Sequence, residues 1–219
     1  PVIIDNMMNL DLLFNVAKAT GNNSYKDIAV RHAMTTMNNH FRPDYTCWHV
    51  VSYNNDGTVE KKQTFQGKND DSSWARGQAW AVYGYTACYR ETKDTTFLNF
   101  AVKVADMIME RVKTDDAIPY WDYDAPVTEE TPRDASAASV TASALIELST
   151  MVPDGKKYLD YAEKILKSLS SDAYLAKVGD NQGFILMHST GSLPNGSEID
   201  TPLNYADYYY ICLLYTSDA

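Results

Sequence analysis

Two helical patterns of opposite character follow each other in ASVTASALIELSTMVPDGKKYLDYAEKILKSL, residues 138–169. The first pattern, up to the Pro-Asp-Gly turn, is built mainly of Ala, Ser, Thr, Val and Leu, which predicts a helix buried on most sides. The second has apolar residues every three or four positions with Lys, Asp and Glu between them, which predicts an amphipathic helix. Together they predict a hairpin made of one inner and one outer helix.

The same pair of patterns occurs twice more in the chain. One copy is AWAVYGYTACYRETKD (79–94) followed by TTFLNFAVKVADMIMERV (95–112). The other is IIDNMMNLDLLFNVAKAT (3–20) followed by a helix from Ser24. Repeated helix hairpins predict an open solenoid or a closed ring, and the long connections between these hairpins favour the ring. We expect a functional site on those connections.

One connection has the character of a strand pair. HVVSYNNDGTVEKKQTF (49–65) contains two β-prone runs around Asn-Asp-Gly, which predicts a small β-hairpin projecting from the helices. No shift in composition and no low-complexity linker divides the chain. We therefore expect a single domain over residues 1–219.

Composition argues against several classes of partner. The chain has 219 residues, 45% of them hydrophobic, and a formal net charge of −10 with the acidic residues scattered, so neither a nucleic acid nor an anionic membrane is an expected partner. No apolar run approaches the roughly 18 residues of a membrane span, and the start lacks the pattern of a signal peptide. The three distant cysteines are expected to be isolated buried thiols rather than a disulfide, and no spacing predicts a metal site.

Two polar residues stand out in apolar surroundings. Asp5 lies near the start of an apolar helix, where it either interacts with the helix dipole or acts as a general acid/base in a partly dry pocket. His49 begins the predicted hairpin and is either a core or surface histidine or part of a site. The residues alone leave both alternatives open.

A cation sits inside the helical segment DDSSWARGQAW, residues 70–80. A Ser before this helix, Ser72 or Ser73, is the expected N-cap. Arg76 either pairs with an Asp of the same segment or, between indoles, receives the carboxylate of a sugar acid, with Trp80 offering a face for stacking. Gln66 precedes this helix and places an amide near it. At the start of a later helix, Asp134 is adequately explained as a cap.

Motifs along the whole chain resemble unsaturated glucuronyl hydrolases of glycoside hydrolase family 88, particularly the Bacteroidetes type. The matching segments are DNMMNLDLLF (5–14), WHVVSY (48–53), TFQGKNDDSSWARGQAWAVYGYT (64–86), PRDASAASVTASALIELS (132–149) and GSEIDTPLNYADYYY (196–210). The resemblance implies an all-α fold, a partial (α/α)6 barrel with a small β-hairpin insertion. It also implies a single catalytic domain that is incomplete at its N-terminus, in a bacterial enzyme of polysaccharide degradation.

The implied substrate is a lyase-generated oligosaccharide, from a glycosaminoglycan or a similar polymer, that ends in a 4,5-unsaturated uronic acid. The implied reaction is hydration of its C4=C5 double bond, with no cofactor and no metal. By the resemblance, the catalytic residue is Asp5, and the residues that bind the unsaturated uronate are His49, Gln66, Arg76 and Trp80. A second catalytic aspartate is expected upstream of Pro1, so we expect the isolated chain to be inactive.

Several alternatives remain at this point. An unsaturated rhamnogalacturonyl hydrolase of family 105 shares barrel and chemistry, and a noncatalytic sugar-binding toroid would share the aromatic cleft. An epimerase would need histidine bases, but His32 and His40 lie on an outer helix. The end of the chain, CLLYTSDA, fits neither the family nor a good helix, so we expect an aberrant tail. Localisation is open, because relatives occur in the cytoplasm and the periplasm.

Overall fold

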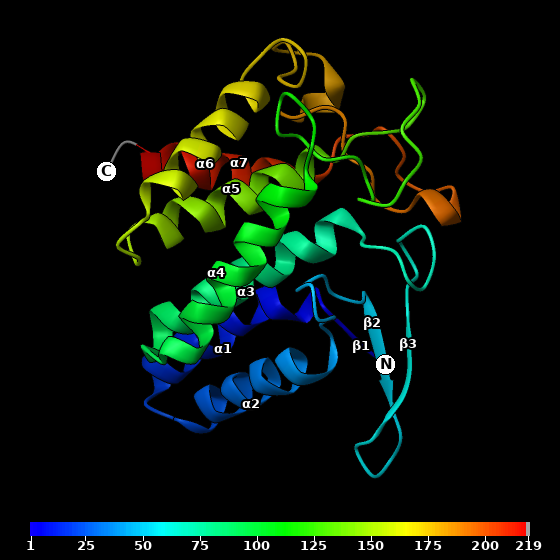
Figure 1. Cartoon of the computed structure of the whole chain (residues 1–219). Coiled ribbons are helices and arrows are strands. Elements are labelled where there is room, and N and C mark those ends of the chain that lie inside the picture. The colour runs from blue at the N-terminus through cyan, green and yellow to red at the C-terminus, as the bar shows by residue number, and fades with distance from the viewer. Residues whose placement is uncertain (218–219) are drawn as a thin grey trace.

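The computed structural model describes residues 1–217 and shows a repeat of helix hairpins with one small sheet (Figure 1). The helices are α1 (Asn6–Thr20), α2 (Ser24–Asn39), α3 (Ala75–Thr92), α4 (Thr95–Arg111), α5 (Ala135–Ser149), α6 (Lys156–Leu169) and α7 (Asn204–Ser217). The strands are β1 (Val2–Ile3), β2 (Val50–Tyr53) and β3 (Val59–Gln63). Two 3-10 turns, Asn181–Gly183 and Leu193–Asn195, lie between α6 and α7.

The helices form an inner and an outer layer, as the repeat predicted. Helices α1, α3, α5 and α7 pack in sequence against one another, and α2, α4 and α6 each pack on the preceding inner helix. The inner helices α3 and α5 are buried over almost their whole length. The outer helix α6 buries only one stripe, at positions three or four residues apart, and exposes its Lys, Asp and Glu.

All four inner helices begin at the same end of the molecule (Figure 1). The long connections that precede α3, α5 and α7 gather at this end. Because the positive end of a helix dipole lies at its N-terminus, this end favours negatively charged groups. The expectation that the connections form a functional end of the fold therefore has a structural basis.

The predicted hairpin is confirmed and is part of a three-stranded antiparallel sheet in the order β1-β2-β3. Strand β1 pairs with β2 through Ile3 and Val50, and the N–H of Ile4 donates to the carbonyl of His49 at 2.9 Å. The prediction of a helix from residue 3 was therefore wrong, because residues 2 and 3 are held as a strand. This pairing brings the start of α1 to the hairpin.

The predicted N-cap of α3 at Ser72 or Ser73 was also wrong. The cap residue is Trp74, which makes no side-chain cap, and the first N–H of the helix, that of Ala75, donates to the carbonyl of Trp121 at 3.0 Å. The hydroxyl of Ser72 instead donates to Asp122 at 2.7 Å. A tertiary contact therefore takes the place of the local cap.

The expected cap at Asp134 is confirmed, since its carboxylate accepts from the backbone N–H groups of Ser136 and Ala137. The tail was expected to be a poor helix, but α7 continues through it to Ser217; residues 218–219 lie outside the described residues. Cys47 and Cys88 are buried and in no disulfide, whereas Cys212 is partly exposed. No helix in residues 1–217 has the length and apolar character needed to cross a membrane.

Candidate active site

Asp5 and His49 lie beside each other at the end where the inner helices begin. The Oδ2 atom of Asp5 is 3.5 Å from Nε2 of His49. Asp5 occupies the N-cap position of α1, yet its side chain accepts no capping hydrogen bond. Its Oδ2 atom is buried and, among residues 1–217, no donor meets it with hydrogen-bond geometry. The helix therefore leaves this carboxyl oxygen available.

The contacts of His49 assign the position of its proton. The backbone N–H groups of Phe65 and Gln66 point to Nδ1 at 3.2 and 3.4 Å. Since backbone N–H groups only donate, Nδ1 accepts, and a neutral ring then carries its proton on Nε2. That nitrogen is the one next to Asp5. The β1–β2 pairing and the backbone after β3 thus aim an N–H group at the Asp5 carboxyl.

An aromatic contact joins this pair to the cation of α3. The ring of Trp74 lies 4.4 Å from the ring of His49, centre to centre. The guanidinium of Arg76 lies 4.5 Å from the centre of the Trp74 ring, a cation–π distance. Asp5, His49, Trp74 and Arg76 therefore form one continuous row of contacts, although they come from three separate segments.

Arg76 is buried, with 2% of its surface exposed, and its partners come from distant parts of the chain. Its Nη1 atom donates to Oδ2 of Asp134 at 2.8 Å and to the carbonyl of Thr190 at 2.6 Å. Its Nη2 atom donates to the carbonyl of Gly191 at 2.9 Å. The alternative of an ion pair within segment 70–80 was wrong. Both terminal nitrogens are engaged by protein acceptors, and the binding of a substrate carboxylate by Arg76 stays a prediction.

Gln66 and Arg76 meet at one carbonyl. Nε2 of Gln66 donates to the oxygen of Gly191 at 2.8 Å, next to the hydrogen bond from Arg76. The backbone of Gly191 comes so close to Glu198 that a Cβ at position 191 would lie 2.6 Å from the Cβ of Glu198. Glycine is therefore required where the last long connection reaches the two predicted binding residues.

Trp80 lies one turn further along α3, apart from the Asp5–His49 pair. It is 2% exposed and packs against two tyrosines of α7, with ring centres 6.1 Å from Tyr205 and 5.5 Å from Tyr209. Its indole nitrogen is buried without a hydrogen-bond partner within the described residues. The stacking of a sugar on Trp80 is not tested by this packing and stays a prediction.

Sequence reasoning missed two residues that shape the site, Tyr205 and Asp122. Tyr205 is the second residue of α7 and faces the guanidinium of Arg76 at 5.2 Å. Burial raises the pKa of the Tyr205 hydroxyl above its usual range, so the group stays protonated. Arg76 and Tyr205 are each the second residue of an inner helix, and the inner helices begin at the same end. The sequence could therefore have indicated that Tyr205 lies near Arg76.

Asp122 is fully buried and ties down the loop that carries Gln66. One of its oxygens accepts from the hydroxyl of Ser72 at 2.7 Å and from the backbone N–H of Lys68 at 2.9 Å. The other accepts from the N–H of Asp124 at 2.9 Å. No local pattern signals this role, because the partners lie about fifty residues apart in sequence.

The remaining histidines lie outside the row of contacts. His40, at the end of α2, is directed to the carbonyl of Val2 at 3.2 Å, and burial lowers its pKa to about 4. His188 pairs with Asp200 at 2.6 Å in the last connection. Within residues 1–217, no three His, Cys, Asp or Glu side chains are grouped so as to hold a metal ion. The site therefore contains the Asp5 carboxyl group next to the imidazole N–H of His49. Aromatic rings connect this pair to Arg76, whose charge is compensated by Asp134.

Comparison with known proteins relates the chain to a family of enzymes. Residues 4–211 match the model of glycosyl hydrolase family 88. The unsaturated glucuronyl hydrolase of Formosa agariphila is 50% identical over 213 residues, which are 96% of this chain and 53% of the relative. The chain thus spans about half the length of the curated relatives it matches.

Solved structures agree in fold. An unsaturated glucuronyl hydrolase specific for heparin superimposes with a TM-score of 0.96 at 54% identity, over 99% of this chain and 59% of that chain. The enzyme of Bacillus sp. GL1 superimposes with a TM-score of 0.92 at 28% identity, over 97% of this chain and 58% of that chain. The likeness confirms the predicted fold class, a partial (α/α)6 barrel with a small sheet. With motifs, hairpin repeat and family model in agreement over the same residues, the chain belongs to glycosyl hydrolase family 88.

Proposed function

We propose that this protein serves to remove a 4,5-unsaturated uronic acid from the non-reducing end of lyase-generated oligosaccharides. Asp5 gives its proton to C4 of the double bond, and the charge that develops at C5 is met by water. The Asp5 carboxylate then helps to take a proton from that water, which leaves a hydroxyl on C5. The resulting hemiketal opens, and the aglycone leaves as an alcohol. In these proton transfers the Asp5 carboxyl group acts first as acid and then as base.

The observation that carries the proposal is the state of the Asp5 side chain. Its Oδ2 atom is buried, lacks a hydrogen bond from the described residues and lies 3.5 Å from the Nε2 atom of His49. A structural aspartate at this depth would normally be satisfied by donors. An oxygen without them can exchange a proton with a substrate, and the imidazole of His49 lies 3.5 Å from it.

The other predicted residues receive roles that fit their contacts. Gln66 and Arg76 hold the Gly191 carbonyl, and through it the last long connection, against the start of α3. The charge of Arg76 is compensated by Asp134, so its proposed role is to position this connection near an acidic substrate. Trp80 packs against Tyr205, and the aromatic pair is the proposed surface for the sugar ring.

The relatives suggest the class of glycan. One solved relative is described as specific for heparin, and a curated relative of Streptococcus pyogenes, 31% identical, as an unsaturated chondroitin disaccharide hydrolase. Glycosaminoglycan disaccharides with an unsaturated glucuronyl end are therefore the proposed substrates. Heparin-derived disaccharides are the first substrates to test, because the heparin-specific relative has a higher identity to this chain than the chondroitin disaccharide hydrolase.

The test follows the ultraviolet absorbance of the conjugated enol-ether carboxylate, which disappears when the double bond is hydrated. It uses a protein that carries the whole barrel with these residues, as wild type, as Asp5→Asn and as the control Asp27→Asn on the exposed face of α2. We expect kcat to fall at least roughly 10³-fold in Asp5→Asn, since proton transfer is lost, and to stay unchanged in the control.

Two results would contradict the proposal. If the wild-type protein folds but leaves every unsaturated disaccharide intact, the proposed reaction is excluded. If kcat of the Asp5→Asn variant stays within about tenfold of the wild-type value, Asp5 is excluded as the catalytic acid/base. The chain of residues 1–219 is expected to be inactive by itself, because a second catalytic aspartate is expected outside it, and turnover by the chain alone would refute that expectation.

A further inference from the structure

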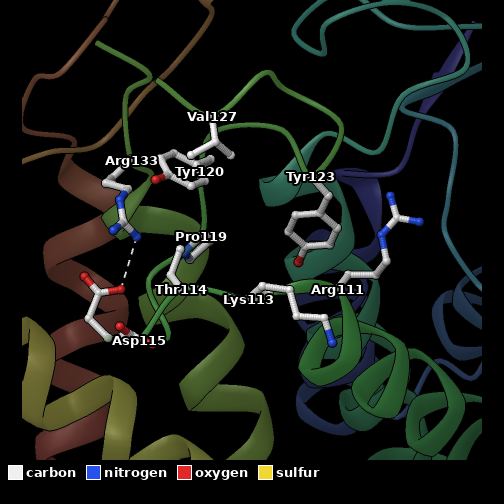
Figure 2. A pocket seen from close by; sticks show the side chains of 11 residues that line it. Arg111, Lys113, Thr114, Asp115, Pro119, Tyr120, Tyr123, Val127 and Arg133 are labelled. Atoms are coloured by element: carbon white, nitrogen blue, oxygen red, sulfur yellow. Dashed lines mark hydrogen bonds and ion pairs between the residues drawn. The ribbon is translucent and has the colours of Figure 1, made fainter. Parts of the chain in front are cut away.

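A cavity lies between the end of α4 and the connection to α5 (Figure 2). Its volume is about 630 Å³, within the range of pockets that hold small ligands. None of the residues predicted for the active site lines it. It is therefore a separate recess, and the chemistry proposed for Asp5 does not use it.

Aromatic and apolar groups form its walls. Figure 2 shows Tyr120, Pro119 and Val127 on one side and Tyr123 on the other. Such faces pack well against the C–H surface of a sugar ring. The Val127 side chain is 68% exposed, so this part of the wall is open to a ligand from solution.

Three cations line the same recess, Arg111, Lys113 and Arg133. Arg133 is held by Asp116 at 3.1 Å and lies over the ring of Tyr120 at 4.5 Å. Arg111 is held by Asp124 at 2.6 Å.

Lys113 is exposed and makes no ion pair with the described residues. Two guanidinium groups are thus fixed in position and one ammonium group is available. The carboxylates of Asp115 and Asp116 line the recess as well, so the Lys113 ammonium group is the cation that the recess offers to an anion.

We propose that this recess binds an acidic saccharide, a sugar unit that carries a carboxylate or a sulfate. The tyrosine rings contact the face of the sugar, Lys113 binds the acidic group, and Asp115 accepts hydrogen bonds from hydroxyls. A neutral apolar ligand would leave these charges unused, and no glycine-rich loop is present to hold a nucleotide phosphate.

The recess shares a segment with the candidate active site. The connection of residues 112–134 lines the recess and also carries Asp122 and Asp134, which hold the Gln66 loop and Arg76. Glycan bound here would therefore be kept at the same end of the barrel as the Asp5–His49 pair. The inference stands independently of the proposed reaction, because it concerns binding by other residues.

The test maps binding by amide chemical-shift changes in the 15N-labelled chain. The probes are tetrasaccharides with a saturated non-reducing end: one of hyaluronan, which has carboxylates only, one of chondroitin 6-sulfate, and neutral maltotetraose. The variants are Lys113→Glu and Tyr120→Ala, with Lys164→Glu on the exposed face of α6 as the matched charge control.

We expect shifts within residues 111–133 with an acidic probe and none with maltotetraose. Lys113→Glu should weaken the affinity about fivefold or more, and Lys164→Glu should leave it unchanged. Binding of both acidic probes would show that a carboxylate suffices, and binding of the sulfated probe alone would show that sulfate is needed. Absence of shifts in this segment, or equal affinities of Lys113→Glu and wild type, would overturn the inference. Failure of the Asp5 reaction would leave this result unaffected.

Discussion

Replacing Asp134 by Asn removes the counter-charge of Arg76 and keeps a side chain that can cap α5. Both residues are buried, with side chains 2% and 0% exposed, and their charged atoms are 2.8 Å apart. At that distance and an effective dielectric constant of about 20, the attraction between two unit charges is about 6 kcal/mol. Carbonyl groups of Thr190 and Gly191 still accept from the guanidinium in the variant and offset part of the loss.

We therefore expect Asp134→Asn to lower the free energy of unfolding by about 3–5 kcal/mol, the usual cost of leaving a buried charge without its partner. Urea titration followed by tryptophan fluorescence measures this change, with equal m-values checked for each variant. Asp94→Asn is the matched control, because Asp94 caps α4 on the surface and makes no ion pair with the described residues. Its cost should be clearly smaller than that of Asp134→Asn.

A double-mutant cycle with Arg76→Met separates the ion pair from its surroundings. When both charges are gone, neither is left buried alone, so the double variant should be more stable than the sum of the two single changes predicts. We expect a coupling of at least about 2 kcal/mol. Additive effects, or a loss in Asp134→Asn no larger than in the surface control, would refute the view that this buried pair supports the start of α3 and α5.

Three further predictions follow from single contacts. Gly84→Ala should destabilise the protein by about 1–3 kcal/mol in urea titration, because the new Cβ would lie 2.5 Å from the Cβ of Met7 in α1; an unchanged midpoint would contradict this packing. The folded-state pKa of His40 is about 4, below its unfolded value of about 6.5, so its contribution to stability is full above pH 6.5 and is lost as pH falls toward 4, by about 3 kcal/mol in total. A His40→Gln variant should show a weaker loss over that window, and an identical slope would exclude His40 as its cause. Burial raises the pKa of the Cys88 thiol to about 12, so iodoacetamide at pH 8 should modify it only after unfolding, as peptide mass spectrometry would show, and labelling of the folded protein would contradict this burial.

Local patterns in the sequence predicted the helices and their layers. The outer helix α6 begins and ends where its amphipathic pattern does, at Lys156 and Leu169, because its stripe of apolar residues and the Pro-Asp-Gly turn are local signals. The hairpin of β2 and β3 and the cap at Asp134 were predictable for the same reason. Residues 3–20 and 70–80 were assigned less well, since strand pairing with β2 and the carbonyl of Trp121 decide where α1 and α3 begin.

The candidate site was predictable only as a set of residues. Sequence motifs single out Asp5, His49, Gln66, Arg76 and Trp80, but they do not say which of these touch. His49 comes next to Asp5 because β1 pairs with β2, and its proton is directed by backbone N–H groups that follow β3. No pattern along the chain encodes the partner of Arg76.

The sequence by itself thus determined the class of fold, the alternation of inner and outer helices and the family, because helix periodicity, turn residues and motifs are properties of short segments. Only the tertiary structure decided that Arg76 faces Asp134, 58 positions away, and Gly191, 115 positions away. The physical reason is that a buried charge pairs with the acceptors that the packed helices and connections bring to it, and that choice depends on how distant segments of the chain pack together.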